Sequence, residues 1–173
     1  MKRSTTLLLL AAVLFAGAGA WFGWHRLAPA APQAAAAASL FGMTLPDMKE
    51  QPQALAQWKG QALLVNFWAT WCAPCVEEMP ELSALHTELT GKSVHVIGIG
   101  IDSPSSMREF AAKVPVSYPL YVGGMGGSEL TRQFGNQAGG LPFSVLISSD
   151  GQVRKTYLGR LNMQEVRRDI AGL

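Results

Sequence analysis

ALLVNFWATWCAPC, residues 62–75, is the part of the chain that says most about its architecture. Residues 62–67 form a nearly continuous apolar run of strand length, which is typical of a strand covered on both faces. The cysteines Cys72 and Cys75 follow shortly, and the pattern predicts a helix from about residue 74 to residue 89, before Gly91. The sequence therefore places two cysteines, with two residues between them, where a buried strand gives way to a helix.

This placement has consequences for the chemistry of the cysteines. The N-terminus of a helix presents unpaired N–H groups and a partial positive charge, so the pKa of a thiol placed there falls. We expect Cys72, at the exposed edge, to attack a substrate disulfide, and Cys75, one turn into the helix, to resolve the mixed disulfide. Pro74 suits the first turn, where its missing N–H costs little.

Other uses of the cysteine pair fit less well. A structural staple closing a four-residue loop would stabilise the protein by only roughly 2 kcal/mol in the chain-entropy model. Structural zinc needs four ligands, and the three histidines, His25, His86 and His95, have no ligand spacing with the pair. Haem attachment needs His directly after the second cysteine, where the chain has Val76. The sequence therefore predicts redox use of the pair, without a metal or an organic cofactor.

A glutamate on the predicted helix forms the second part of the candidate site. At about 100° per residue, one arc of the helix collects its apolar side chains, namely Cys75, Met79, Leu82, Leu85 and Leu89. Glu78 projects into this arc, where burial would raise the pKa of its carboxyl toward the range useful for proton transfer. We expect Glu78 and Cys75 to exchange a proton and to titrate as a coupled pair. The alternative is a glutamate at the margin of the arc whose carboxyl reaches water.

Leu141 and Pro142 directly precede a further apolar run, residues 143–147. A proline at this place has two interpretations that spacing alone leaves open. It is either an ordinary edge proline, or a cis proline whose neighbour offers backbone groups to a substrate strand.

The remaining elements alternate in a way that predicts an α/β fold with a central mixed sheet flanked by helices. Expected strands cover residues 40–45, 62–67, 94–101, 120–122, 143–147 and 153–158, the last two joined around Asp150 and Gly151. Expected helices cover residues 74–89, 103–113, 128–134 and 162–170. Residues 123–127, rich in glycine, are expected to form a flexible connection.

The N-terminal part has a different composition. Residues 7–24 are apolar without a charge, just long enough to cross a ~30 Å hydrocarbon core. The basic pair Lys2 and Arg3 precedes them, which places the start in the cytoplasm. Residues 1–27 are therefore predicted to form a transmembrane anchor or a cleaved signal peptide, both of which remain open. Residues 28–39 are predicted to be an Ala/Pro-rich linker, and residues 40–173 the globular domain.

Composition limits the classes of partner. The chain has 173 residues, of which 49% are apolar and 15% charged, so a disordered protein is excluded. It has 14 basic and 12 acidic residues, and three of the basic ones, Lys2, Arg3 and Arg26, flank the apolar segment. The rest of the chain is close to neutral, so no nucleic-acid partner is expected.

The motif VNFWATWCAPC, residues 65–75, followed by Glu78, Met79 and Pro80, resembles the TlpA/ResA/CcmG-type thioredoxins of bacterial envelopes. The resemblance runs from about residue 40 to the C-terminus. It implies a thioredoxin-like fold, Cys72 as nucleophile and Cys75 as resolving thiol, and a cis peptide at Leu141–Pro142. Glu78 matches the buried glutamate of the family, and Asn66 stands where cytosolic thioredoxins have a buried Asp. The expected substrate-binding residues are Trp71, Ala73, Pro74, Leu141 and Pro142.

The resemblance also implies a cellular setting. Such proteins are held in the bacterial inner membrane by an N-terminal helix, face the periplasm, and draw electrons from a membrane thiol transporter. Several members reduce apocytochrome c before haem attachment. We therefore expect a thiol:disulfide oxidoreductase that reduces disulfides of exported proteins, periplasmic and soluble if the signal is cleaved.

Two rival functions fit the sequence less well. A thiol peroxidase usually has Thr or Ser three residues before the reactive cysteine, where this chain has Ala69. A copper-binding assembly protein of similar fold would need a wider cysteine spacing and a distal His, and no His follows His95. Ala73 and Pro74 do not by themselves determine the direction of electron flow, because potentials in such proteins span about −270 to −120 mV.

Overall fold

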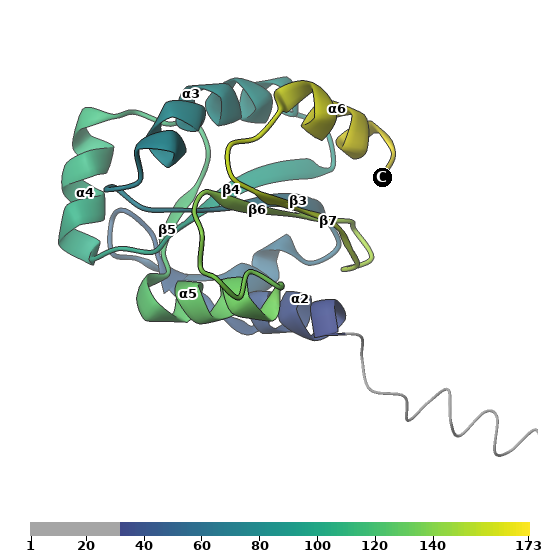
Figure 1. Ribbon diagram of the computed structural model, residues 1–173, viewed down its shortest axis with the longest axis horizontal. Coiled ribbons are helices and arrows are strands. Elements are labelled where there is room, and N and C mark those ends of the chain that lie inside the picture. The colour runs from purple at the N-terminus through teal and green to yellow at the C-terminus, as the bar shows by residue number, and fades with distance from the viewer. Residues whose placement is uncertain (1–31) are drawn as a thin grey trace, which may run out of the picture. The chain divides into compact units, whose positions relative to one another are not determined.

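The computed structural model describes residues 32–173. A five-stranded sheet forms its centre, with α3 and α6 on one face and α2 and α5 on the other (Figure 1). The strands are β3 Ala62–Trp68, β4 Val94–Gly100, β5 Leu120–Val122, β6 Phe143–Ile147 and β7 Val153–Leu158. The helices are α2 Pro32–Gly42, α3 Ala73–Glu88, α4 Pro104–Lys113, α5 Gly124–Gln133 and α6 Met163–Ala171. A small hairpin of β1 Thr44–Pro46 and β2 Pro52–Ala54 precedes the 3-10 helix η1 Leu55–Trp58.

The sheet is mixed, as the sequence predicted. Its strand order is β5-β4-β3-β6-β7; β3 and β4 are parallel, β4 and β5 are parallel, and β6 is antiparallel to both β3 and β7. The register pairs Trp68 with Gly100, and Gly100 with Val122, so the carboxyl ends of three strands meet at one edge. Each of these strands is followed by a helix, and this edge therefore collects three helix N-termini.

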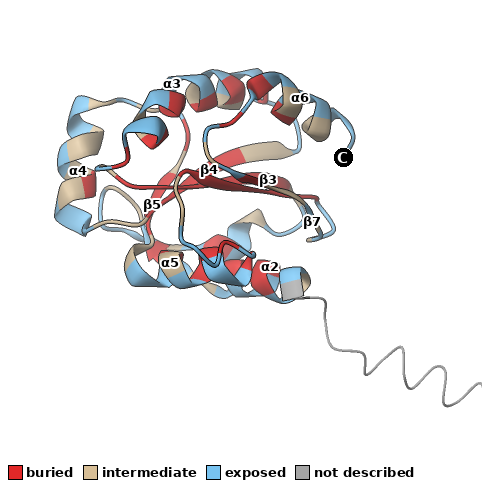
Figure 2. Ribbon diagram, viewed as in Figure 1, coloured by how far each residue is buried: buried red, intermediate tan, exposed pale blue. Residues whose placement is uncertain are grey.

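Two layers of apolar side chains enclose the sheet. All seven residues of β3 are buried, because this central strand is covered on both faces (Figure 2). Leu64 and Trp68 pack in the layer under α3, whereas Val65 and Phe67 pack in the layer that includes α2 and α5. The uninterrupted apolar run in the sequence is thus explained by alternate residues entering different layers.

The predicted linker over residues 28–39 is wrong from Pro32 onward, where the chain forms helix α2. Its small and apolar side chains are buried in the same layer as Val65 and Phe67; they belong to Ala36, Ala37, Leu40 and Phe41. The helix α2 contacts α5 and η1. Alanine is the best helix former, and its small side chain allows close packing, so this alanine run builds structure. The predicted strand at residues 40–45 is likewise reduced to β1.

The glycine-rich segment also differs from the prediction. Residues 124–127 form the first turn of α5. A Cβ on Gly123, the residue before this turn, would lie 2.5 Å from Ile99 Cγ2 on β4, so this glycine allows the start of the helix to pack closely on the sheet. Burial against the sheet compensates for the poor helix propensity of glycine.

The predicted anchor or signal peptide, residues 1–27, lies outside the described residues, as do residues 28–31 of the predicted linker. Within residues 32–173, no helix combines the length and the apolar character needed to cross a bilayer.

Candidate active site

Cys72 and Cys75 form a disulfide at the start of α3. Cys72 is the residue that precedes the helix, and Cys75 lies in its first turn. Cys75 is completely buried, while Cys72 keeps 6% of its surface exposed. Cys72 is therefore the more exposed of the two cysteines, as predicted, but only a small part of it is accessible. Trp71 beside it is 70% exposed. The accessible parts of this loop are therefore Trp71 and the exposed residues Ala73 and Pro74.

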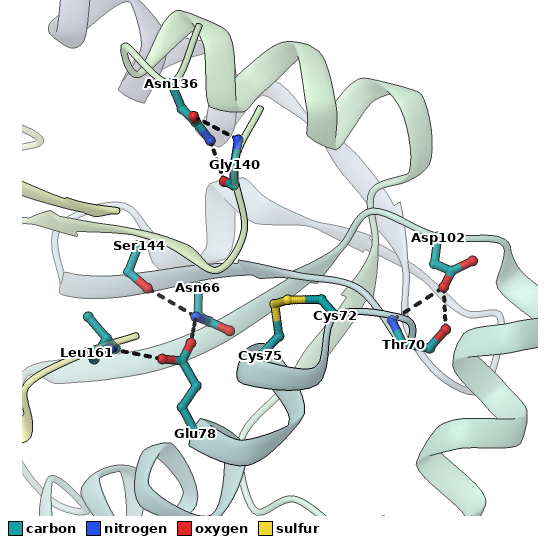
Figure 3. Close-up of a disulfide and its surroundings, with 10 residues drawn as sticks. All are labelled: Asn66, Thr70, Cys72, Cys75, Glu78, Asp102, Asn136, Gly140, Ser144 and Leu161. Carbon is teal, nitrogen blue, oxygen red and sulfur yellow. Dashed lines mark hydrogen bonds between the residues drawn. A yellow bond between two sulfur atoms is a disulfide. The ribbon is translucent and has the colours of Figure 1, made fainter. Parts of the chain in front are cut away.

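An aspartate holds the turn that leads into the cysteines. The backbone N–H of Thr70 donates to Asp102 Oδ2 over 3.3 Å, and Thr70 Oγ1 donates to the same oxygen (Figure 3). Burial favours a higher pKa for Asp102, but the hydrogen bonds from Thr70 and Ser103 outweigh it, and the pKa of this carboxyl is lowered. Asp102 follows β4 directly, and this contact ties the cysteine loop to the neighbouring strand.

Glu78 is fully buried, as the helical arc predicted, and the alternative of a carboxyl that reaches water is wrong. Its Oε1 accepts a hydrogen bond from Asn66 Nδ2 at 2.7 Å, and its Oε2 accepts one from the backbone N–H of Leu161 at 3.1 Å. Burial raises the pKa of Glu78, and the hydrogen bonds from Leu161 and Asn66 oppose that rise without cancelling it. The site thus holds a carboxyl suited to taking up and returning a proton.

Asn66 lies between Glu78 and the disulfide in Figure 3. Besides Glu78, its amide nitrogen donates to Ser144 Oγ at 3.0 Å, across the β3–β6 pairing. The family resemblance marked the position of Asn66, but the sequence predicted neither this contact nor the part played by Ser144. A lone polar residue inside an otherwise apolar strand was the available signal.

The Leu141–Pro142 peptide bond is cis, as the resemblance implied. Phe143, which follows, pairs with Phe67 near the carboxyl end of β3, so this peptide lies at the sheet edge from which the cysteine loop emerges. The backbone N–H of Gly159 donates to Pro142 O at 2.8 Å. The cysteine loop and the Leu141–Pro142 segment, which are distant in sequence, thus meet at one edge of the sheet.

A buried asparagine that the sequence did not single out shapes the loop before this proline. Asn136 Nδ2 donates to Gly140 O at 2.8 Å, and the Gly140 N–H donates to Asn136 Oδ1 at 3.2 Å (Figure 3). The two hydrogen bonds close residues 136–140 into a compact loop that ends next to Leu141. No periodicity or spacing in the sequence marks this pair.

The chain as a whole is similar to several known proteins. The Redoxin family model matches residues 29–170. The thiol-disulfide oxidoreductase ResA of Geobacillus kaustophilus is 25% identical over 130 residues, which cover 75% of this chain and 72% of that protein. A thioredoxin-related protein from Neisseria meningitidis serogroup B is 32% identical with a TM-score of 0.65, covering 73% of this chain and 96% of its own.

A more distant structure supports the fold alone. The thioredoxin-family thiol:disulfide interchange protein of Chlorobium tepidum TLS superposes with a TM-score of 0.64 at 24% identity, over 75% of this chain and 91% of that one. The fold is thus thioredoxin-like, in agreement with the resemblance seen in the motif. With a family match over most of its length and a disulfide at the start of α3, the chain belongs to the Redoxin family and is a thiol:disulfide oxidoreductase.

Proposed function

We propose that this oxidoreductase reduces disulfides of exported proteins on the outer side of the bacterial inner membrane, with Cys72 attacking, Cys75 resolving and Glu78 moving the proton. One observation supports this most: the Cys72–Cys75 disulfide starts α3, and a fully buried carboxyl lies one turn further along the same helix. A structural disulfide would have no use for a buried glutamate behind it.

The first step is attack by the reduced enzyme. The Cys72 thiolate lies directly before the first turn of α3, where the positive end of the helix dipole favours negative charge. It attacks one sulfur of the substrate disulfide, the substrate S–S bond breaks, and one substrate sulfur leaves as a thiolate. The enzyme and the other substrate sulfur are then joined through Cys72.

The second step releases the product. Cys75 gives its proton to the Glu78 carboxylate, and the Cys75 thiolate attacks Cys72. The mixed disulfide breaks, its electron pair goes to the second substrate sulfur, and the proton is returned to that leaving group. The enzyme ends as the Cys72–Cys75 disulfide of the structure. The substrate ends as one thiol, which received the Cys75 proton, and one thiolate, which takes a proton from water. This cycle uses no metal and no organic cofactor.

Substrate docking is assigned to the two segments that meet at the sheet edge. Trp71, with most of its surface exposed, and the exposed residues Ala73 and Pro74 provide an apolar rim around the disulfide. Leu141 provides the backbone groups beside which an extended substrate segment can pair, and the cis Pro142, whose C=O accepts from Gly159, shapes that edge.

The setting follows from the N-terminal sequence. The apolar residues 7–24 behind a basic pair support a membrane anchor or a cleaved signal, and either delivers the domain to the periplasm. The dithiol is then regenerated by a membrane thiol transporter. One relative is named ResA. We propose that the substrates are proteins whose disulfides form in the same compartment, and that apocytochrome c is one of them.

The redox state of the pair in cells tests this function. Rapid acid quenching followed by thiol alkylation is expected to find Cys72 and Cys75 mostly reduced. A pair that is fully oxidised at steady state contradicts a reductase. Cys75→Ser is expected to trap mixed disulfides with substrates, which mass spectrometry identifies, and Cys72→Ser serves as the matched control that traps none. Tight Cu(I) binding without disulfide reduction would instead favour the copper-binding rival.

A further inference from the structure

Asn66 Oδ1 is a buried acceptor without a hydrogen-bond partner among the described residues. Buried polar atoms are nearly always hydrogen-bonded, because leaving one without a partner forfeits its hydration. The side chain itself is completely buried. An acceptor left open in the middle of the central strand therefore indicates a donor that the oxidised enzyme lacks.

The orientation of the amide is determined by its other contacts. Its nitrogen lies 2.7 Å from Glu78 Oε1 and 3.0 Å from Ser144 Oγ. The reverse orientation would set the amide oxygen against an ionised carboxylate, so the nitrogen belongs on the Glu78 side. The oxygen then points away from Glu78, toward the side of Cys75 (Figure 3).

Reduction creates the missing donor at that side. In the disulfide, the Cys75 sulfur carries no hydrogen, whereas reduction breaks the S–S bond and gives a Cys75 S–H group, which is a weak donor. We propose that Asn66 is a positioning residue of the reduced enzyme, whose Oδ1 accepts a hydrogen bond from the Cys75 thiol while its amide N–H holds the Glu78 carboxylate. This inference rests on the proposed roles of Cys75 and Glu78.

Asn66 does not itself take the proton. It holds the proton donor, Cys75, and the acceptor, Glu78, on either side of one amide, whose backbone lies in the fully buried central strand β3. The proton leaves the thiol for the carboxylate when Cys75 attacks, and the Asn66 N–H favours the ionised carboxylate until then. The protonation of Glu78 also responds to Arg160, which favours the ionised form, and to Glu81, which disfavours it. Burial and the charge of Glu78 raise the pKa of Tyr118.

A vibrational measurement tests the hydrogen bond without any catalysis. The S–H stretch of Cys75 is recorded by infrared spectroscopy in reduced protein carrying Cys72→Ser, which leaves one thiol. Adding Asn66→Ala is expected to move the band to higher frequency, because the S–H bond loses its acceptor. Ser144→Ala is the matched control, which removes a neighbour of the amide and keeps the oxygen, so the band is expected to stay. An unmoved band in Asn66→Ala overturns the proposal.

A kinetic measurement tests the consequence. Reduced enzyme is mixed with dithiobis-nitrobenzoate, an aromatic disulfide that releases a coloured thiolate first on attack by Cys72 and again on resolution by Cys75. Asn66→Ala is expected to leave the first phase within about twofold and to slow the second about tenfold at neutral pH, the effect of one lost hydrogen bond to a charged group. The pH midpoint of the second phase is expected to rise, because the Glu78 carboxylate loses a donor that favours its ionised form.

The outcomes separate this inference from the proposed function. If the wild-type enzyme shows no first phase, the proposed role of Cys72 fails, and the S–H band still decides on Asn66. If Asn66→Ala slows both phases equally and unfolds at lower temperature, its role is structural and the inference is overturned. Asn66→Ser, whose side chain is too short to reach both partners, repeats the test if the alanine variant does not fold.

Discussion

Replacing Asn136 by alanine removes the two hydrogen bonds that close the loop before Pro142. The affected groups are the N–H and C=O of Gly140, which directly precedes the cis Leu141–Pro142 peptide. Because Asn136 is buried, with 5% of its surface exposed, water does not simply replace its amide. We expect the loop to lose its single conformation while the sheet stays intact.

The size of the effect follows from these contacts. Two hydrogen bonds at about 1 kcal/mol each correspond to a loss of about 2 kcal/mol in the free energy of unfolding. For a domain of this size, that lowers Tm by roughly 5–10 °C. If about 1 kcal/mol of substrate binding energy is then used to order residues 136–142, the KM for a peptide disulfide rises about fivefold. The chemistry at Cys72 is unchanged, so kcat is expected to stay within about twofold.

Steady-state reduction of a peptide disulfide, together with thermal unfolding of the oxidised protein, measures both effects. Ser148→Ala is the matched control. Ser148 is also buried, and its hydroxyl donates to Asp150 Oδ1 at 2.5 Å and accepts from Arg154 Nε at 3.0 Å, but it lies just after β6, at the opposite end of that strand from Pro142. We expect it to lower Tm comparably without a change in KM.

The reasoning would be refuted by either of two results. One is an unchanged KM in Asn136→Ala despite the lower Tm, which would show that the loop does not position substrate. The other is an equal rise in KM in both variants, which would show that general destabilisation is sufficient.

Three further predictions concern other parts of the structure. Burial raises the pKa of Glu78 in the folded state, so its contribution to stability is complete below the unfolded pKa and is lost as pH rises through the folded value. Urea unfolding of wild type and Glu78→Gln should therefore show the wild type losing stability relative to the variant as pH rises above about 4, by about 1.4 kcal/mol per unit of pKa difference, and a pH-independent gap would contradict this. Gly123→Ala would put a Cβ 2.5 Å from Ile99 and 3.2 Å from the backbone of α5, and this backbone cannot move aside as a side chain can. Unfolding in denaturant should therefore show that the free energy of unfolding falls by about 1–3 kcal/mol. An unchanged free energy would show that α5 shifts freely. Thr70→Val removes the side-chain hydrogen bond to Asp102, so the pKa of Asp102 should rise in an NMR titration of its carboxyl carbon. An unchanged value would mean that the remaining backbone donors, the N–H groups of residue 70 and Ser103, are sufficient to hold it down.

The parts of the site that could be predicted from sequence are those determined by local pattern. Cys72, Cys75 and Glu78 lie on one short segment, and the 3.6-residue period of a helix places Glu78 among apolar residues whatever the rest of the chain does. The cis form of the Leu141–Pro142 bond came only with the family resemblance, because spacing alone left it open.

The alanine-rich segment shows how composition can mislead. Residues 32–39 have the makeup of a flexible tether, yet they form the first turns of α2 and bury Ala36 and Ala37. Whether an alanine run is a tether or a packed helix depends on a partner surface, here α5 and η1, that lies far along the sequence. The same holds for the glycines that begin α5.

The sequence by itself determined the chemistry of this protein: a strand, two cysteines and a helix that carries a glutamate on its apolar face. Tertiary structure alone decided which groups meet these residues. Asn66, on β3, donates a hydrogen bond to Glu78, and Ser144 accepts one from Asn66 because β6 pairs antiparallel with β3. The Leu161 N–H, from the segment before α6, donates to Glu78. The physical reason is range: a helical period depends on neighbours three or four residues apart, whereas these contacts join residues 12, 78 and 83 positions apart, and only the packed sheet brings them together.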